Sequence, residues 1–182
     1  YEQQEAILGE QRKSFSKTDT DATFMRMKED HMKNGQLKPG YNLQVSTNNQ
    51  YITHYSIHQA TTDTTTLKEH LTDFKTEYQT MPAVVTADAG YGSEENYAYL
   101  EQNNITAYVK HSQFDREQNE NLQSKKPFSA DKLYYNQEQD YYVCPMGQHM
   151  ENSGSYNKKT AAGFIQTITQ YESKNCNGCP LN

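Results

Sequence analysis

The sequence predicts an α/β domain with a mixed sheet, followed by a smaller β-rich segment that contains the cysteines. Between residues 41 and 109, alternating apolar runs and helical apolar stripes follow one another in the order strand, strand, helix, strand, helix, strand. From residue 132 onward, short tyrosine-rich strands and cysteines replace that pattern. Only 34% of the residues are hydrophobic and 15 are tyrosines, so we expect a lean core in which buried tyrosine hydroxyls need hydrogen-bond partners.

Residues 41–58 are predicted to form an antiparallel hairpin. Apolar and polar residues alternate from Tyr41 to Val45 and again from Tyr51 to Ile57, on either side of a polar turn at 47–50. A period of two is typical of half-buried strands, and the short polar connection favours direct pairing of the two runs.

The histidines show no pattern of a nucleophilic site. His54 and His58 lie on the strand face opposite to Tyr55 and Ile57, and we expect that face to be exposed to solvent rather than to bind a metal. His111 follows a strand and could approach the site discussed below.

A helix is predicted after the threonine-rich stretch 61–64. The spacing of four, three and four residues places one apolar stripe along it, made of Leu67, Leu71, Phe74 and Tyr78. Asp63 is interpreted as the N-cap of this helix, because aspartate and threonine are favoured there. The helix is expected to end at Met81 and Pro82.

The next segment predicts a strand, a tight turn, a second helix and a second strand. The run 83–87 is short and rich in β-branched residues, and the turn from Asp88 to Gly92 follows it directly. Ser93 is expected to cap a helix, and 105–109 is expected to be another buried strand.

The flanking segments complete the predicted organisation. Residues 22–33 favour a short helix or an ordered loop with Phe24, Met25 and Met27 pointing inward. Two short tyrosine-rich runs around a polar turn predict a second hairpin at 133–144, and 164–168 predicts a further strand. The predicted parts are a polar N-terminal stub (1–17), a core (18–111), a linker (112–131) and a cysteine-containing β segment (132–182).

Charge and hydropathy exclude several classes of protein. The net charge of −6 argues against a free-standing nucleic-acid binder with a broad basic surface, although not against a DNA enzyme whose basic segments lie elsewhere. No apolar run approaches the length of a membrane span and no leader pattern is present, which excludes membrane and secreted proteins. Because the chain opens on Tyr1 and closes just after a Cys-x-x-Cys motif, both ends are expected to be cut.

Asp88 is the strongest candidate for chemistry. It follows a predicted buried strand, and functional groups of α/β sheets gather at the carboxyl ends of strands. Gly90 and Gly92 would let a ligand approach the backbone. The alternative is that Asp88 caps a turn or the following helix. A lone carboxylate cannot support phosphoryl chemistry, because further acidic residues are needed to hold Mg²⁺ ions.

The cysteines form a second candidate constellation. Cys176 and Cys179 make a Cys-x-x-Cys motif, and Cys144 lies 32 residues earlier. In a chain without an export signal, metal binding is favoured over disulfides. Tetrahedral zinc needs four ligands, and His149 is one candidate for the fourth. The alternative is reduced thiols in a segment that holds no metal.

Five blocks of this sequence, in order, resemble bacterial insertion-sequence transposases of the DDE type, and the similarity runs from about residue 18 to the end. The blocks are Thr18-Asp19-Thr20-Asp21-Ala22, Gly40-Tyr41-Asn42-Leu43-Gln44 followed by Asp63, Val85-Thr86-Ala87-Asp88-Ala89-Gly90-Tyr91-Gly92-Ser93, Cys144-Pro145-Met146-Gly147, and Cys176-Asn177-Gly178-Cys179-Pro180-Leu181.

This resemblance implies a ribonuclease-H-like catalytic core in which three acidic residues hold two Mg²⁺ (or Mn²⁺) ions for DNA strand cleavage and transfer. By resemblance Asp88 is the second of the three. The third, a glutamate on a downstream helix, is absent here, and so is the Asp-Gly-Thr-like motif that carries the first. Asp19 and Asp21 are weaker candidates for metal ligands; the favoured alternative is that they cap a turn or helix.

The resemblance also implies an incomplete fold. The first strand of a ribonuclease-H-like sheet lies between the hairpin and the strand that bears the second aspartate, so its absence would leave a gap. We therefore expect a partial mixed sheet, with Asp88 ending a strand in the same sheet as 41–58, and a chain that is catalytically incompetent alone. The β segment is expected to be a truncated zinc-ribbon-like insertion, whose fourth ligand would be a cysteine beyond Asn182 rather than His149.

Partners follow from the same resemblance. It implies binding to terminal inverted repeats and target DNA, homo-oligomers of the full enzyme, and a cytoplasmic, nucleoid-associated bacterial protein. Tyr91 and Lys110 are candidate DNA contacts, with turn packing and solvation as the alternatives. Two other functions stay open: a non-catalytic remnant or zinc- or partner-binding module, and an unrelated metal-dependent hydrolase that uses Asp88.

Overall fold

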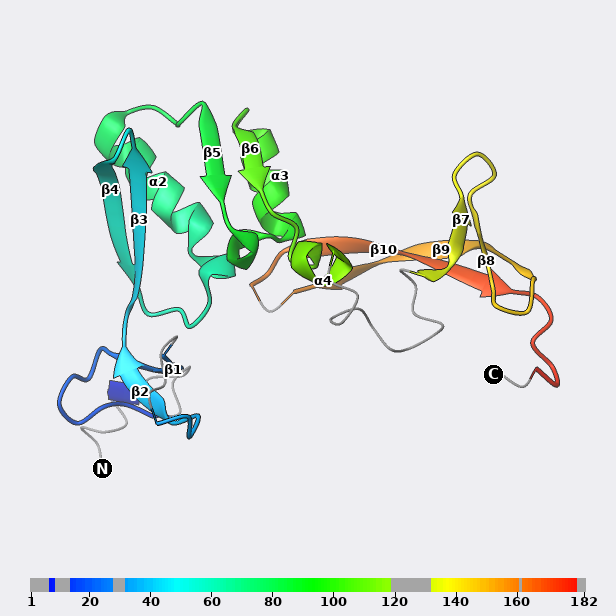
Figure 1. Cartoon of the computed structure of the whole chain (residues 1–182), viewed down its shortest axis with the longest axis horizontal. Helices are drawn as coiled ribbons and strands as arrows, with labels where there is room; N and C mark the ends of the chain where they lie inside the picture. The colour runs from blue at the N-terminus through cyan, green and yellow to red at the C-terminus, as the bar shows by residue number, and fades with distance from the viewer. Residues whose placement is uncertain (1–6, 9–13, 28–31, 119–131, 161, 180–182) are drawn as a thin grey trace. The chain divides into compact units, whose positions relative to one another are not determined.

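A computed structural model describes residues 7–8, 14–27, 32–118, 132–160 and 162–179 (Figure 1). The chain divides into two compact units, residues 1–114 and 115–182. Each unit is described by itself below. Most of the predicted N-terminal stub and of the predicted linker lies outside the described residues.

The segment after the stub is a strand, so the predicted helix or loop at 22–33 is wrong where the structure describes it. Strand β1 (Thr23–Arg26) pairs antiparallel with β2 (Leu37–Gly40), with Thr23 opposite Gly40. Met25 is buried as predicted. The backbone of β1 has its hydrogen-bond partners in β2, which lies beyond residues 22–33. The local pattern could therefore not predict this strand.

The predicted hairpin is confirmed as β3 (Asn42–Asn48) and β4 (Tyr51–His58), which pair antiparallel. The turn is tighter than predicted and consists of Asn49 and Gln50, both at positive φ, the conformation that two-residue hairpin turns require.

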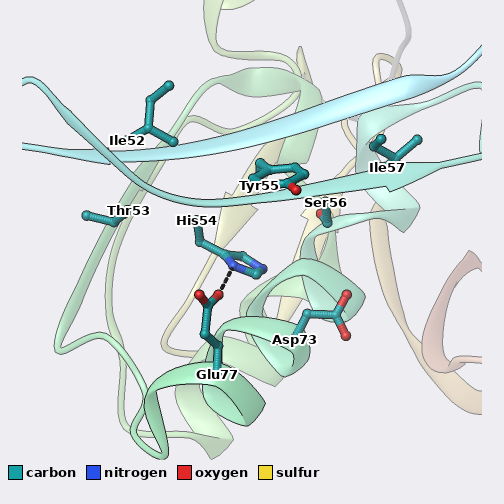
Figure 2. Close-up of a pocket in the computed structure, with 8 residues that line it drawn as sticks. All are labelled: Ile52, Thr53, His54, Tyr55, Ser56, Ile57, Asp73 and Glu77. Atoms are coloured by element: carbon teal, nitrogen blue, oxygen red, sulfur yellow. Dashed lines mark hydrogen bonds and ion pairs between the residues drawn. The ribbon is translucent and has the colours of Figure 1, made fainter.

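The hairpin, however, buries the opposite face from the one that its apolar residues suggest. His54 and His58 are only 9% and 7% exposed, whereas Tyr55 and Ile57 are more than 60% exposed. Figure 2 shows His54 directed toward the helix below the strand, with Ile57 on the other side. The prediction of a solvated histidine face is therefore wrong.

The physical reason is a set of hydrogen bonds to the helix that covers this face. Nδ1 of His54 lies 2.7 Å from Glu77, and Nδ1 of His58 lies 2.9 Å from Glu69. Partners of this kind allow polar side chains to be buried. Among the described residues, Nε2 of His54 is a buried side-chain atom that lacks a hydrogen-bond partner.

Helix α2 (Leu67–Tyr78) carries the predicted apolar stripe, and its Leu67 and Leu71 are buried. It ends at Gln79, which adopts the left-handed conformation. The prediction that Asp63 caps this helix is wrong. Asp63 opens a short 3₁₀ turn, η1 (Asp63–Thr65), and Thr66 occupies the N-cap position.

The second half of the first unit is a strand–helix–strand motif. Strand β5 (Val84–Ala87) pairs in parallel with β6 (Thr106–Val109), and α3 (Glu94–Gln102) connects them after the 3₁₀ turn η2 (Ala89–Tyr91). Ser93 accepts a hydrogen bond from the backbone of Asn96 at 3.2 Å, as its predicted capping role requires. The core is built by the buried residues Leu67, Leu71, Leu100 and Ile105.

The hairpin β3–β4 and the pair β5–β6 are separate two-stranded sheets. The prediction that Asp88 ends a strand in the same sheet as residues 41–58 is therefore wrong as stated. β3 and β5 lie side by side (Figure 1), but a groove of about 590 Å³ lies between them and is also lined by α2. The two sheets do not join because no described strand lies between them, which agrees with the expected gap.

The second unit is a four-stranded antiparallel sheet in the order β10-β9-β8-β7. The predicted hairpin is confirmed as β7 (Tyr134–Asn136) and β8 (Tyr141–Val143), and the predicted last strand as β10 (Ile165–Ser173). β9 (His149–Lys159) was not predicted. The helix α4 (Phe114–Gln118) begins the segment that was predicted to be a linker.

Tyrosine rings pack against one another on this second sheet. None of its described residues is buried. The rings of Tyr142 and Tyr171 meet edge to face at 4.9 Å, and Tyr135 packs on Tyr142 at 4.6 Å. The hydroxyls of Tyr135 and Tyr171 both donate to Asp140. The expectation that buried tyrosines contribute to the core is wrong for the described residues, because no tyrosine among them is buried.

The helices that the structure describes include none that is both long and apolar enough to cross a bilayer.

Candidate functional site

Asp88 lies where the sequence predicts it, directly after β5. It is the N-cap of η2, and its Oδ1 accepts a hydrogen bond from the backbone N–H of Gly90 at 2.9 Å. Its side chain is exposed. The capping role is thus present, but it uses one oxygen only, and Oδ2 of Asp88 makes no hydrogen bond to any residue that the structure describes.

A second carboxylate, which the sequence reasoning missed, faces the same turn. Oδ1 of Asp63 accepts hydrogen bonds from the amides of Asn42 at 2.8 Å and Gln44 at 3.1 Å. A methyl group built on Gly90 would lie 3.0 Å from Oδ1 of Asp88 and 3.3 Å from Oδ2 of Asp63. The two carboxylates therefore flank Gly90. The capping pattern around Asp63 hid this role, because the partners lie about twenty residues away.

Tyr91 connects this turn to the hairpin. Its hydroxyl donates to Oε1 of Gln44, and Gln44 itself is buried. The pKa of Tyr91 is raised, because burial and then the negative charges of Asp63 and Asp88 disfavour the phenolate. The structure thus places Tyr91 in turn packing, and its predicted DNA contact stays a prediction.

The η1 and η2 turns are bonded to each other. The hydroxyl of Thr64 donates to the carbonyl of Gly90 at 2.8 Å. The amide of Asn96 donates to the carbonyls of Thr64 and Tyr91, both at 2.8 Å. Asn96 is buried, so these bonds fix the relative position of the two turns.

Gly92 serves backbone packing rather than ligand approach. A Cβ atom at this position would lie 2.5 Å from the carbonyl oxygen of Lys110, closer than any real contact allows. The backbone of Lys110 thus adjoins the Asp88 turn, while its ammonium group lies 5.3 Å from the centre of the Phe114 ring. The predicted contact between Lys110 and DNA stays a prediction.

Asp19 and Asp21 lie in the turn that precedes β1. Oδ1 of Asp19 accepts hydrogen bonds from the backbone of Asp21 and of Ala22, at 3.1 and 3.3 Å, and the hydroxyl of Tyr41 donates to the same carboxylate. This is the turn-capping role that the sequence favoured. The carbonyl of Asp21 accepts a bond from Gln59 at 2.9 Å.

The three cysteines form no disulfide and lie at two turns of the second unit. Gln148 connects these turns, because its backbone N–H donates to Sγ of Cys144 at 3.3 Å and its side chain donates to the carbonyl of Asn175 at 2.7 Å. The ring of His149 stacks on Tyr141 at 4.0 Å. In the part of the chain that the structure describes, no three His, Cys, Asp or Glu side chains group closely enough to hold a metal ion. The predicted zinc site stays a prediction.

Comparison with known proteins bears on this site. A family model described as "Transposase DDE domain" matches residues 12–168, which include both turns and most of the second unit. Neither a curated protein nor a solved structure gives a significant match. The mixed α/β architecture of the first unit is compatible with the ribonuclease-H-like fold that such a domain implies.

Proposed function

This chain belongs to the transposase DDE domain family, and we propose that within it Asp88 is a ligand of the divalent ion used for DNA strand cleavage and transfer. The observation that carries the proposal is the position of Asp88 at the carboxyl end of β5 with Oδ2 left without a hydrogen bond to the described residues. Family membership implies DNA as the partner.

The ligand atoms around Asp88 are of the type that Mg²⁺ or Mn²⁺ prefers, but the described residues offer too few of them to complete the coordination shell. Both ions prefer oxygen ligands, and carboxylates are the usual protein donors. Asp88 supplies a carboxylate oxygen to the site. Asp63, on the other side of Gly90, adds negative charge, while its Oδ1 accepts from Asn42 and Gln44. Asp19 is occupied by its own turn. A bound divalent ion would activate the attacking oxygen and stabilise the leaving one. The described side chains would contribute one part of its coordination shell, with Asp88 held in place by Gly90.

The open groove supports a further part of this proposal. The edges of β3 and β5 that face each other both carry backbone groups that no described strand satisfies. A strand placed between them would pair with both edges and would end beside Asp88 if it ran parallel to β5. We propose that such a strand, from outside the described residues, brings another acidic residue to Asp88, and that this chain alone does not cleave DNA.

A Mn²⁺ titration followed by electron paramagnetic resonance tests the role of Asp88. Asp88→Asn should weaken Mn²⁺ binding to the chain at least tenfold, because it removes the carboxylate charge at the end of β5. Glu101→Gln, which removes one exposed carboxylate at the far end of α3, serves as the matched control. Equal binding by the wild-type chain and Asp88→Asn would refute the metal role.

The DNA around the gene tests the wider proposal. A reading frame that encodes an aspartate on a strand before this segment and a glutamate on a helix after it, between inverted repeats, is the expected finding. Intact genes of an unrelated pathway on both sides, without repeats, would favour the metal-dependent hydrolase instead. Oligomers and recognition of the terminal repeats belong to the complete enzyme and are proposed for it alone.

A further inference from the structure

Asp63 has a role that the proposed metal chemistry does not assign. We infer that Asp63 is a positioning residue, which orients the Asp88 carboxylate through Gln44, Tyr91 and the η2 turn. The reason for orienting Asp88 rests on the proposed function of Asp88. The hydrogen bonds that would orient it are present without a metal.

The first step concerns the direction of the hydrogen bonds. A carboxylate only accepts, so the side chain of Gln44 must turn its NH₂ group toward Asp63. That orientation aims the carbonyl oxygen of Gln44 at the hydroxyl of Tyr91, which then donates. The same NH₂ group also donates to Oδ1 of Asn42 at 2.7 Å, and the amide of Asn42 donates to Asp63 at 2.8 Å. The carboxylate of Asp63, which only accepts, therefore orients both amides, whereas an amide at position 63 could turn either its oxygen or its NH₂ group toward them.

The second step connects Tyr91 to Asp88. Tyr91 ends the three-residue turn η2, and its backbone N–H donates to the carbonyl of Asp88 at 3.3 Å. The middle residue, Gly90, donates to Oδ1 of Asp88. Fixing the ring of Tyr91 on the hairpin thus fixes the turn that holds the carboxylate of Asp88.

The third step is the direct contact between the two turns. Thr64, the neighbour of Asp63, donates its hydroxyl to the carbonyl of Gly90 at 2.8 Å. Gly90 is consequently held on its carbonyl side by η1 and on its N–H side by Asp88. Because Gly90 has no side chain, the carboxylates of Asp63 and Asp88 can both approach it.

Amide-proton exchange of Gly90, followed by NMR on the metal-free 182-residue chain, tests the inference. Asp63→Asn should speed this exchange about tenfold, the factor that corresponds to the loss of one ordinary hydrogen bond. Tyr91→Phe removes the hydrogen bond between Tyr91 and Gln44 while it keeps Asp63. It should speed the exchange of Gly90 by a similar factor. Glu101→Gln also replaces a carboxylate by a neutral amide, but it lies outside the site. It should therefore leave the exchange rate of Gly90 unchanged.

Two results would overturn the positioning role. One is unchanged exchange at Gly90 in Asp63→Asn. The other is faster exchange spread evenly over β3 and α2, because this would show general destabilisation rather than a local effect. The thermal unfolding midpoint of each variant, measured alongside, identifies a variant that merely fails to fold, and Tyr91→Phe then decides the question.

Measurement of Mn²⁺ binding separates a failure of this inference from a failure of the proposed function on which it rests. Asp63→Asn should weaken Mn²⁺ binding several-fold, but by less than Asp88→Asn. An equal loss would make Asp63 a ligand itself and would overturn the positioning role. If Asp88→Asn does not change Mn²⁺ binding, the proposed function fails, whereas the metal-free exchange result still decides whether Asp63 orients the turn.

Discussion

The hydroxyl oxygen of Ser46 lies 2.7 Å from Nε2 of His70, and this contact joins strand β3 to helix α2 through a buried imidazole. The other ring nitrogen of His70 lies 2.5 Å from the hydroxyl of Ser56. His58 contacts the same hydroxyl at 2.7 Å and Glu69 at 2.9 Å. Since Glu69 only accepts, His58 donates to it, Ser56 donates to His58, and His70 donates to Ser56. Ser46 then donates to a neutral His70.

Stability should fall as pH is lowered below about 6.5. The pKa of His70 is lowered to about 4, mainly by burial and then by repulsion from His54 and His58, although Asp73 opposes the shift. The unfolded chain therefore binds more protons between these pH values, and the folded state loses free energy there. We expect a loss of about 2 kcal/mol between pH 7.5 and pH 5, measured by urea unfolding.

The control for this prediction is His70→Gln, which cannot titrate at that position. Its unfolding free energy should depend less on pH than that of the wild-type chain. Glu69 and Glu77, which face His58 and His54, are intact in both proteins. The same pH slope in both would show that another group causes the loss.

Leucines that look equivalent in the sequence should differ sharply in their contribution to stability. Leu71 is 3% exposed and belongs to the core cluster, whereas Leu43 is 58% exposed on the open face of the hairpin. Leu71→Ala should lower the unfolding free energy by about 3 kcal/mol, because it leaves a cavity, and Leu43→Ala by less than about 0.5 kcal/mol. Similar losses in denaturant titrations would mean that the open face is covered in solution.

Replacement of Gly92 by alanine should destabilise the first unit. The added methyl group would meet the backbone carbonyl of Lys110 at 2.5 Å, and a backbone atom cannot move aside as a side chain can. Overpacking of this kind costs about 1–3 kcal/mol, which thermal unfolding would report as a lower midpoint. Gly35→Ala is the comparison, since no atom lies within 4 Å of its Cβ position and only its positive φ opposes the change. A larger loss for Gly35→Ala would contradict this account.

The zinc prediction is tested by the metal content of the purified chain. If Cys144, Cys176 and Cys179 share a zinc ion, elemental analysis should find about one zinc per chain, the number that a single tetrahedral site requires. Cys144→Ser and Cys176→Ser should each remove it. His149→Ala distinguishes the fourth ligand, because retention of zinc would assign that place to another group. A wild-type chain that binds no zinc would support the reduced, metal-free alternative.

Local elements were the predictable part of this molecule. The stripe of α2 and the cap at Ser93 follow from residues three or four positions apart, and the structure contains both. Asp88 is also placed as predicted, because a β-branched run followed by a glycine-containing turn determines where β5 ends. Such features depend on backbone geometry over a few residues.

Features that depend on partners far along the chain could not be predicted in this way. The alternation in 42–58 shows that the two faces of the hairpin differ, but not which one α2 covers. His70, 24 residues from Ser46 and 14 from Ser56, decides that the polar face is inside. In the sequence, a helix cap at Asp63 and an acceptor of long-range amide hydrogen bonds look the same, because both need only a carboxylate before a helix.

By itself, then, the sequence determined the order of the strands and helices between residues 41 and 109, the place of Asp88 and the family to which the chain belongs, since each depends on short motifs. The tertiary structure alone decided which face of the hairpin is buried, that β3 and β5 stay unjoined, and that Asp63 reaches the Asp88 turn. The physical reason is that hydrogen bonds between side chains far apart in the sequence produce no periodic pattern in the neighbouring residues. The same holds for an unpaired strand edge.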